Sequence, residues 1–479
     1  MGVVKNSSIL MLGSASAQLI PLLTLPILTR LYEPEAIGLQ ALAITWATAI
    51  SVIATLRLDL ASVLSKTERE AERVVHATIT TMLMVVPIVA MLLAFCAQFV
   101  LALIGHNDAV FWLWLLPVLS LAMSLTQLGS SIQIRHRTFG RMSLVNVINQ
   151  ATTQGIAIGI GAFSGWLGGM VLARVLGQMA AVATLWPLGL GPYMRTWRFS
   201  IRGFKAVISE CRQFVVFNTP YSLVSTVARD APLLIFGALA SAATVGFYGL
   251  ARVVMYVPVS LISVSVGPVF FREAVDHIHT PVLEQLARRL LRLGLLIPAA
   301  GFAIVVVEGP DIFVFAFGDQ WRAAGEFAAV LAPAFWIALQ GSWIGRVFEV
   351  TGKQRRQFVM QLISDPIVIA SVTVSMIVWN NLLVAVTVFA TLTAAQALVY
   401  FFVAAHVAGF RAASLIREWI IGAVLFLTMI GTIELVARVL THGNIWWSLL
   451  YAVAVTVTVL LILTRQLLKK AYRRKWRIQ

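Results

Sequence analysis

Long apolar runs separated by short polar segments dominate this chain. Most runs extend for about 20 residues, the length that an α-helix needs to cross the hydrocarbon core of a bilayer. The alternation predicts about fourteen membrane-spanning helices, near residues 9–28, 37–58, 76–104, 111–134, 143–165, 168–190, 214–238, 245–270, 290–308, 323–347, 358–378, 382–405, 419–438 and 445–464.

Composition supports the same class of protein. Hydrophobic residues make up 59% of the 479 residues and charged residues only 12%, whereas charged residues are about 25% of a typical soluble domain. A soluble chain of this composition would lack a polar surface to present to water. We therefore predict an all-α integral membrane fold.

Basic residues are distributed unevenly between the two sides of the predicted membrane. With the N-terminus in the cytoplasm, 29 of the 36 lysines and arginines fall in cytoplasmic segments or, for Arg292 and Arg346, at the cytoplasmic ends of spans, and only Arg30, Arg322 and Arg438 fall outside. Basic segments are retained on the cytoplasmic side during insertion. The net charge of +16 is therefore interpreted as a topology signal and not as a nucleic-acid site, and both termini are predicted to be cytoplasmic.

Two short segments resemble each other 208 residues apart. PEAIGLQALA (34–43) opens the second predicted span and AATVGFYGLA (242–251) opens the eighth. Similar halves in parallel orientation are typical of two-lobed transporters. We predict two pseudo-symmetric six-helix lobes followed by two further helices, with bounds at 1–190 (first lobe), 191–213 (cytoplasmic connector), 214–405 (second lobe) and 406–479 (last two spans and basic tail).

The loops offer little room for an enzyme. The two longest are predicted to be cytoplasmic, near 191–213 and 271–289, and the second has the apolar spacing of an amphipathic helix that leads into the ninth span. We find no phosphate-binding GxxxxGK[ST] loop and no metal-ligand motif, so no cofactor or metal is predicted. A membrane-bound polymerase or glycosyltransferase would need a larger outer loop, and stays an alternative.

Besides Arg292 and Arg346, which lie at the cytoplasmic ends of their spans, and Arg438 at an outer end, four arginines fall within predicted spans: Arg57, Arg174, Arg229 and Arg252. Each arginine at the bilayer centre costs about 2.5–3.5 kcal/mol on insertion scales, so such residues usually face water, a partner or a ligand. The guanidinium group binds phosphate through two parallel hydrogen bonds. We predict a cationic cavity for a phosphorylated lipid. Snorkelling of Arg57 to the interface and pairing of Arg174 with a neighbour are the structural alternatives.

Carboxylates inside the spans are the candidates for coupling to an ion. They are Asp59, Asp230 and Asp365, with Glu434 available near the end of the thirteenth span. A multidrug and toxic-compound antiporter would need such a buried acidic site. That activity is the main alternative among transporters.

The segment 23–71 resembles the N-terminal region of bacterial polysaccharide-export flippases. The elements are LPILTRLY at the end of the first span, the turn PEAIG, and LRLDLAS at the end of the second. RTFGRMSLVN (137–146) is also similar to this family. The resemblance implies a member of the multidrug/oligosaccharidyl-lipid/polysaccharide exporter superfamily.

The resemblance also implies an activity. Such a protein flips undecaprenyl-diphosphate-linked oligosaccharide, an O-antigen, exopolysaccharide or capsule repeat unit, across the bacterial inner membrane by alternating access. Arg57 and Arg252 would contact the diphosphate or sugar acids, with Arg30 as a further candidate. Membrane lipids, a polysaccharide polymerase and chain-length machinery are the implied partners. A lipid II flippase has the same architecture and is a second alternative.

Overall fold

The computed structural model describes residues 19–95, 110–136, 138–437, 450 and 454. This part of the chain is helical and contains no strand. Eleven of its helical segments are long and apolar enough to cross a membrane. The shorter apolar helix Leu19–Leu31 and helix α7 (Phe139–Ser164) correspond to two further predicted spans, and the fourteenth, 445–464, falls outside the described residues except for 450 and 454. The prediction of an all-α, multi-pass membrane protein is confirmed.

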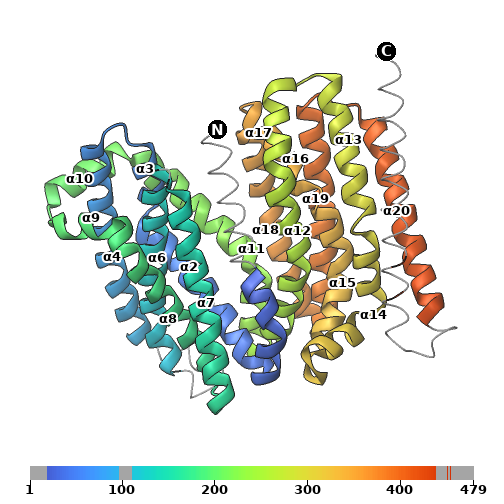
Figure 1. Ribbon diagram of the computed structural model, residues 1–479, viewed down its shortest axis with the longest axis horizontal. Helices are drawn as coiled ribbons and strands as arrows, with labels where there is room; N and C mark the ends of the chain where they lie inside the picture. The colour runs from blue at the N-terminus through green and yellow to red at the C-terminus, as the bar shows by residue number, and fades with distance from the viewer. Residues whose placement is uncertain (1–18, 96–109, 137, 438–449, 451–453, 455–479) are drawn as a thin grey trace. The chain divides into compact units, whose positions relative to one another are not determined.

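The chain divides into two compact units, residues 1–249 and 250–479. Helix α12 (Ala242–His277) contains the division between them. The predicted bounds of the lobes and the connector stay a prediction. In Figure 1 the first unit runs from blue to green along the chain and the second from green to red.

The first unit is a bundle of helices with short links. Its elements are α2 (Pro34–Thr55), α3 (Leu58–Leu64), α4 (Glu68–Phe95), α6 (Val110–Arg135), α7, α8 (Gly169–Leu185), α9 (Gly191–Thr196), α10 (Ile201–Glu210) and α11 (Thr219–Leu239). Helix α2 packs against α4, α6, α8 and α11. Between α7 and α8, Gly165 takes the left-handed conformation (φ 55°) that ends a helix abruptly, as the two-residue gap between the spans predicted at 143–165 and 168–190 requires.

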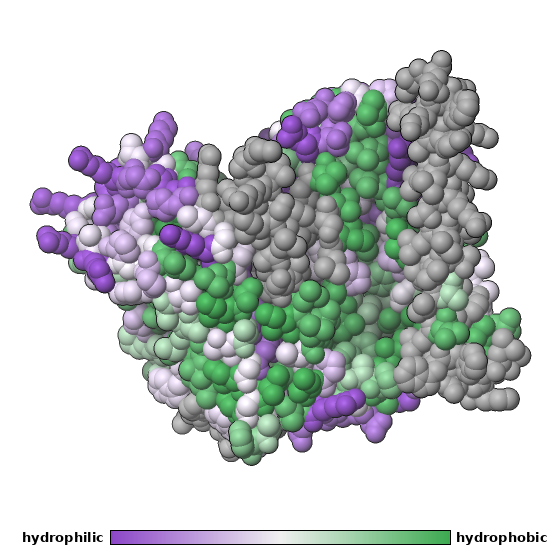
Figure 2. Space-filling model, in the orientation of Figure 1, coloured by the Kyte–Doolittle hydropathy of each residue, from purple (hydrophilic) through white to green (hydrophobic). Residues whose placement is uncertain are grey.

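The surface of this unit is divided between polar and apolar parts. Figure 2 shows hydrophilic residues gathered over α9 and α10, with apolar residues along the sides of the helices. On α4, Leu83, Ile88 and Met91 are all exposed. An exposed apolar belt of this kind suits contact with lipid and not with water.

The two repeat-like segments lie against each other where α2 meets the start of α12. A Cβ atom added to Gly38 would lie 1.8 Å from the carbonyl oxygen of Ala242, and one added to Gly246 would lie 2.0 Å from that of Pro34. The two backbones are therefore in direct contact, which only glycine permits. Gly38 and Gly246 occupy the same position in their segments, so the resemblance marks a contact between equivalent glycines.

The second unit begins within α12. It continues with α13 (Pro281–Leu296), α14 (Ala299–Phe317), α15 (Arg322–Ala338), α16 (Gly341–Ile344), α17 (Arg346–Val350), α18 (Gln354–Trp379), α19 (Leu382–Val407) and α20 (Ala412–Leu435). Its core is aromatic: the rings of Trp336 and Phe426 stack at 4.5 Å between centroids. Asn380 (φ 46°) ends α18, and the Asn381 side chain accepts hydrogen bonds from the first amides of α19, so the second very short turn is capped.

Helix α13 is the amphipathic helix predicted near 271–289, but it begins later. Residues 271–277 continue α12, and α13 starts at Pro281 after His279 takes a left-handed conformation (φ 61°). Proline lacks an amide hydrogen and favours the first position of a helix, so the start is displaced to this residue. Leu283, Ala287, Leu291 and Leu295 recur every four residues and are all buried.

Candidate functional site

Arg57 lies where α2 ends and α3 begins. Leu56 and Arg57 both take the left-handed conformation (φ 46° and 54°), which costs roughly 1–2 kcal/mol for each non-glycine residue. The Arg57 Nε donates a hydrogen bond of 2.8 Å to Oγ of Ser222, which is buried on α11. The break therefore directs the guanidinium away from α2 and toward α11.

The two terminal nitrogens of Arg57 make no hydrogen bond with any described residue. The side chain is half-buried, so these nitrogens stay available to a ligand. Because the Nε hydrogen bond orients the guanidinium, the pair of terminal nitrogens is presented as a fork. This geometry suits two oxygens of a phosphate group.

Asp59, two residues further along, is almost fully buried, with 1% of its surface exposed. Its Oδ2 accepts hydrogen bonds from Gln127 Nε2 (3.1 Å) and Ser131 Oγ (3.4 Å) on α6. Its Oδ1 has no hydrogen-bond partner within the described part of the chain. A buried carboxylate oxygen without a partner is costly and is rarely kept without a function.

The hydrogen bonds of Asp59 belong to a buried polar network between α2, α3 and α6. Ser51 donates to Gln127 Oε1 at 3.2 Å, and Ser124 donates to Ser51 at 3.1 Å. Sequence reasoning identified Asp59 but missed the α6 residues. The signal was present, because Ser124, Gln127 and Ser131 follow at intervals of three and four residues and so line one face of a helix.

We expect Asp59→Leu to lower the stability of the protein more than Asp59→Asn. Leucine leaves the half-buried Gln127 and the buried Ser131 without this acceptor, and a buried donor without an acceptor costs about 1–3 kcal/mol. Asparagine keeps a side-chain oxygen for Gln127 and serves as the matched control. Thermal unfolding of the purified protein in detergent measures the difference. Equal midpoints for the two variants would show that the network does not stabilise the fold.

The other predicted residues of the first unit have different environments. Arg30 is exposed at the end of helix Leu19–Leu31. Arg229 on α11 is also exposed, and its Nε lies 3.7 Å from Oδ1 of Asp230. The Nε of Arg174 on α8 is shielded from solvent and has no hydrogen-bond partner among the described residues. The alternative that a neighbouring residue pairs with Arg174 is therefore not supported at this atom.

In the second unit, Arg252 is half-buried on α12. Asp365 on α18 accepts a 3.1 Å hydrogen bond from Gln396 of α19, and Gln396 also donates to Ser364 at 2.7 Å. Asp365 therefore has a neutral polar partner from the neighbouring helix. The assembly of the predicted arginines into one cavity stays a prediction.

An ion pair in the second unit was not anticipated from the sequence. Arg292 of α13 binds Glu418 of α20 through two hydrogen bonds of 2.7 and 2.6 Å. The residues are 126 positions apart, and neither belongs to a motif that could have linked them. The pair holds α13 against α20.

Comparison with known proteins identifies the family of this chain. The sequence profile of the family described as polysaccharide biosynthesis protein matches residues 3–273, more than half of the chain. This chain belongs to that family. The resemblance noted for 23–71 and 137–146 falls within the matched region, so the recognition is confirmed. A comparison with curated protein sequences finds no match.

Several solved structures have the same fold as this chain. The lipid II flippase MurJ in an inward closed conformation superposes with a TM-score of 0.75 at 12% identity, over 96% of this chain and 99% of that one. A multidrug resistance MATE family transporter of the MOP superfamily, in an inward-facing conformation, gives 0.57 at 12% identity, over 85% and 95%. A MOP superfamily transporter from Pyrococcus furiosus gives 0.54 at 13%, also over 85% and 95%. At these identities the likeness establishes the fold.

Proposed function

We propose that this protein flips an undecaprenyl-diphosphate-linked oligosaccharide from the cytoplasmic to the outer face of a bacterial inner membrane. The cargo would be an O-antigen, exopolysaccharide or capsule repeat unit, and the mechanism alternating access. On this proposal the protein is a transporter and not an enzyme, with both termini cytoplasmic. Membership of the polysaccharide biosynthesis family carries the proposal, and the fold shared with a lipid II flippase supports it.

The arginines would recognise the diphosphate of the cargo. Arg57 is the best supported, because a backbone break and the Ser222 hydrogen bond orient it while its terminal nitrogens stay available. Arg252 and Arg174 are proposed as further contacts, since each is a partly buried cation within a membrane-spanning helix. Arg229 and Arg30 are more exposed and are weaker candidates.

Asp59 is the best supported of the three carboxylates proposed for ion coupling. It is buried, and its Oδ1 is without a hydrogen-bond partner in the described residues. A proton or a small cation at this oxygen would supply the partner that Oδ1 lacks. Asp230 has a cationic neighbour and Asp365 has Gln396, and neither has a solvent-shielded oxygen without a partner among the described residues.

Two other cargoes are kept as alternatives. The shared fold is also that of a lipid II flippase and of multidrug transporters. The arginines favour an anionic lipid over a cationic drug, because a cation would be repelled by them. A polymerase and chain-length machinery are proposed as partners on the basis of the family resemblance.

Deletion of the gene in its host tests the proposal. We expect surface polysaccharide to be lost while diphosphate-linked oligosaccharide accumulates on the cytoplasmic face of the inner membrane. A labelled glycan-binding protein, applied to membrane vesicles of each orientation, measures the two faces separately. The wild-type gene, restored on a plasmid, is the control and should reverse both effects.

The alternatives give different results in the same experiment. Intact polysaccharide export with new sensitivity to cationic dyes would contradict the flippase and support the antiporter. Accumulation of the peptidoglycan precursor with cell lysis would support the lipid II flippase.

A further inference from the structure

A pocket of about 360 Å³ lies at the start of α13, within the second unit. Its walls come from the link between α12 and α13, the first two turns of α13, and the link between α19 and α20. His279 Nδ1 lies 3.1 Å from the carbonyl oxygen of Ala408 and so donates to it, which joins the two links. Gly409, at φ 78°, lies next to His279 in the second of these links.

One face of α13 presents three charged residues toward α20 at intervals of four. Two of them have partners: Glu284 accepts a 3.0 Å hydrogen bond from Ser414, and Arg292 forms its ion pair with Glu418. The middle residue, Arg288, has none among the described residues, although its Nε is shielded from solvent. Arg288 lines the pocket, and no hydrogen bond or ion pair joins its guanidinium to any described residue.

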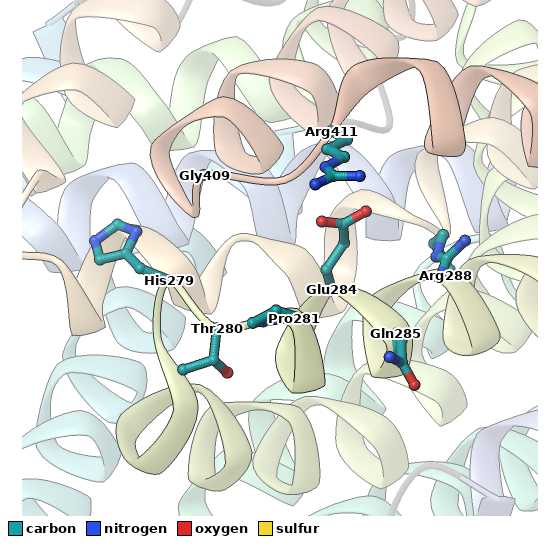
Figure 3. A pocket seen from close by; sticks show the side chains of 8 residues that line it. All are labelled: His279, Thr280, Pro281, Glu284, Gln285, Arg288, Gly409 and Arg411. Atoms are coloured by element: carbon teal, nitrogen blue, oxygen red, sulfur yellow. The ribbon is translucent and has the colours of Figure 1, made fainter.

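Other features of the pocket also favour an anion. Arg411 lines it and forms no ion pair within the part of the chain that the structure describes. Figure 3 shows the Arg411 guanidinium above the Glu284 carboxylate, with Arg288 on the next turn of α13. The Thr280 side chain makes no capping hydrogen bond at the start of α13, and Glu284 lies in the first turn of that helix.

We propose that this pocket binds a phosphate group through Arg288 and Arg411. Two guanidinium groups carried by different segments offer donors from more than one direction, which suits the tetrahedral arrangement of phosphate oxygens. The single carboxylate of the pocket, Glu284, is outnumbered by the two arginines and is held by Ser414. The phosphate would belong to a phospholipid head group or to a soluble phosphate.

The purified full-length protein in a neutral detergent tests this site. The probes are phosphatidylglycerol, diacylglycerol, which has the same acyl chains without the phosphate, and inorganic phosphate. Binding is measured as the concentration that produces half of the maximal rise in thermal midpoint. We expect phosphatidylglycerol to raise the midpoint and diacylglycerol not to do so. Arg288→Gln should weaken the response about tenfold, as the loss of a charge-assisted hydrogen bond implies.

Two further variants distinguish a binding site from a general effect of charge or folding. Arg289→Gln removes the same charge from the adjacent, exposed position and should respond like the wild type. Arg411→Gln alters an exposed residue just before α20 and should weaken binding without changing the midpoint in the absence of lipid.

A response to phosphatidylglycerol alone identifies a lipid head group as the ligand, and an equal response to inorganic phosphate identifies a soluble phosphate. No response to either phosphate probe, or equal weakening by the exchanges at 288 and 289, would overturn the proposal. The readout is binding and not transport, so its failure would leave the proposed flippase activity untouched.

Discussion

Arg57→Ala is expected to reduce transport of the lipid-linked cargo by about 10- to 100-fold, with the protein still present in the membrane at normal level. The loss of one charge-assisted hydrogen-bonding group costs about 1.5–3 kcal/mol, which corresponds to this range. Among the described residues, the guanidinium forms one hydrogen bond, to Ser222. Its removal should therefore affect the cargo more than stability.

Restoration of surface polysaccharide in the deletion strain measures this effect, with protein level followed by immunoblot. Arg57→Lys should recover only part of the activity, because an ammonium group keeps the charge but lacks the fork. Arg69→Ala, an exchange of the same kind at an exposed position on α4, is the matched control and should be fully active. Full activity of Arg57→Ala would remove Arg57 from the proposed binding site.

Gly38→Ala is expected to cause the largest loss of folded protein. The added Cβ would lie 1.8 Å from the Ala242 carbonyl oxygen and 2.8 Å from its carbon. Both atoms belong to the backbone, so no side chain can rotate away and α2 must separate from α12. Overpacking of this kind costs about 1–3 kcal/mol or more, against the roughly 1 kcal/mol that alanine gains over glycine in a helix.

Membrane abundance and thermal midpoint in detergent measure the loss, and Gly246→Ala should behave in the same way because it meets the Pro34 carbonyl. Gly301→Ala on α14 is the matched control, since no atom lies within 4 Å of its added Cβ. That variant should be at least as stable as the wild type. If Gly38→Ala were as abundant as Gly301→Ala, the close contact between α2 and α12 would be wrong.

Much of the architecture could be predicted from the sequence because a membrane imposes a simple rule. A chain in hydrocarbon must satisfy its backbone hydrogen bonds within each spanning segment, so every apolar run of sufficient length becomes a helix. The short links at Gly165 and Asn380 fall between predicted spans that lie only two or three residues apart, and the structure ends each helix there with a residue in the left-handed conformation.

The candidate site was only partly accessible to sequence reasoning. Arg57 and Asp59 could be identified because charged residues are rare in spans. The break in the helix at residues 56–58 could not be predicted, because this segment has no glycine or proline. The partners of these residues, Ser222 and Gln127, lie 165 and 68 positions away. Local pattern carries no information about such distant contacts.

The sequence by itself therefore determined the class of protein, the positions of the helices and the residue types able to bind a phosphate, because burial in lipid acts on each segment separately. The tertiary structure decided which of those residues have partners. Arg292 pairs with Glu418, whereas Arg288, one turn earlier, has no partner among the described residues, and Gly38 contacts Gly246. Those outcomes depend on the packing of helices that are far apart in the chain, and packing is a property of pairs of helices and not of any single one.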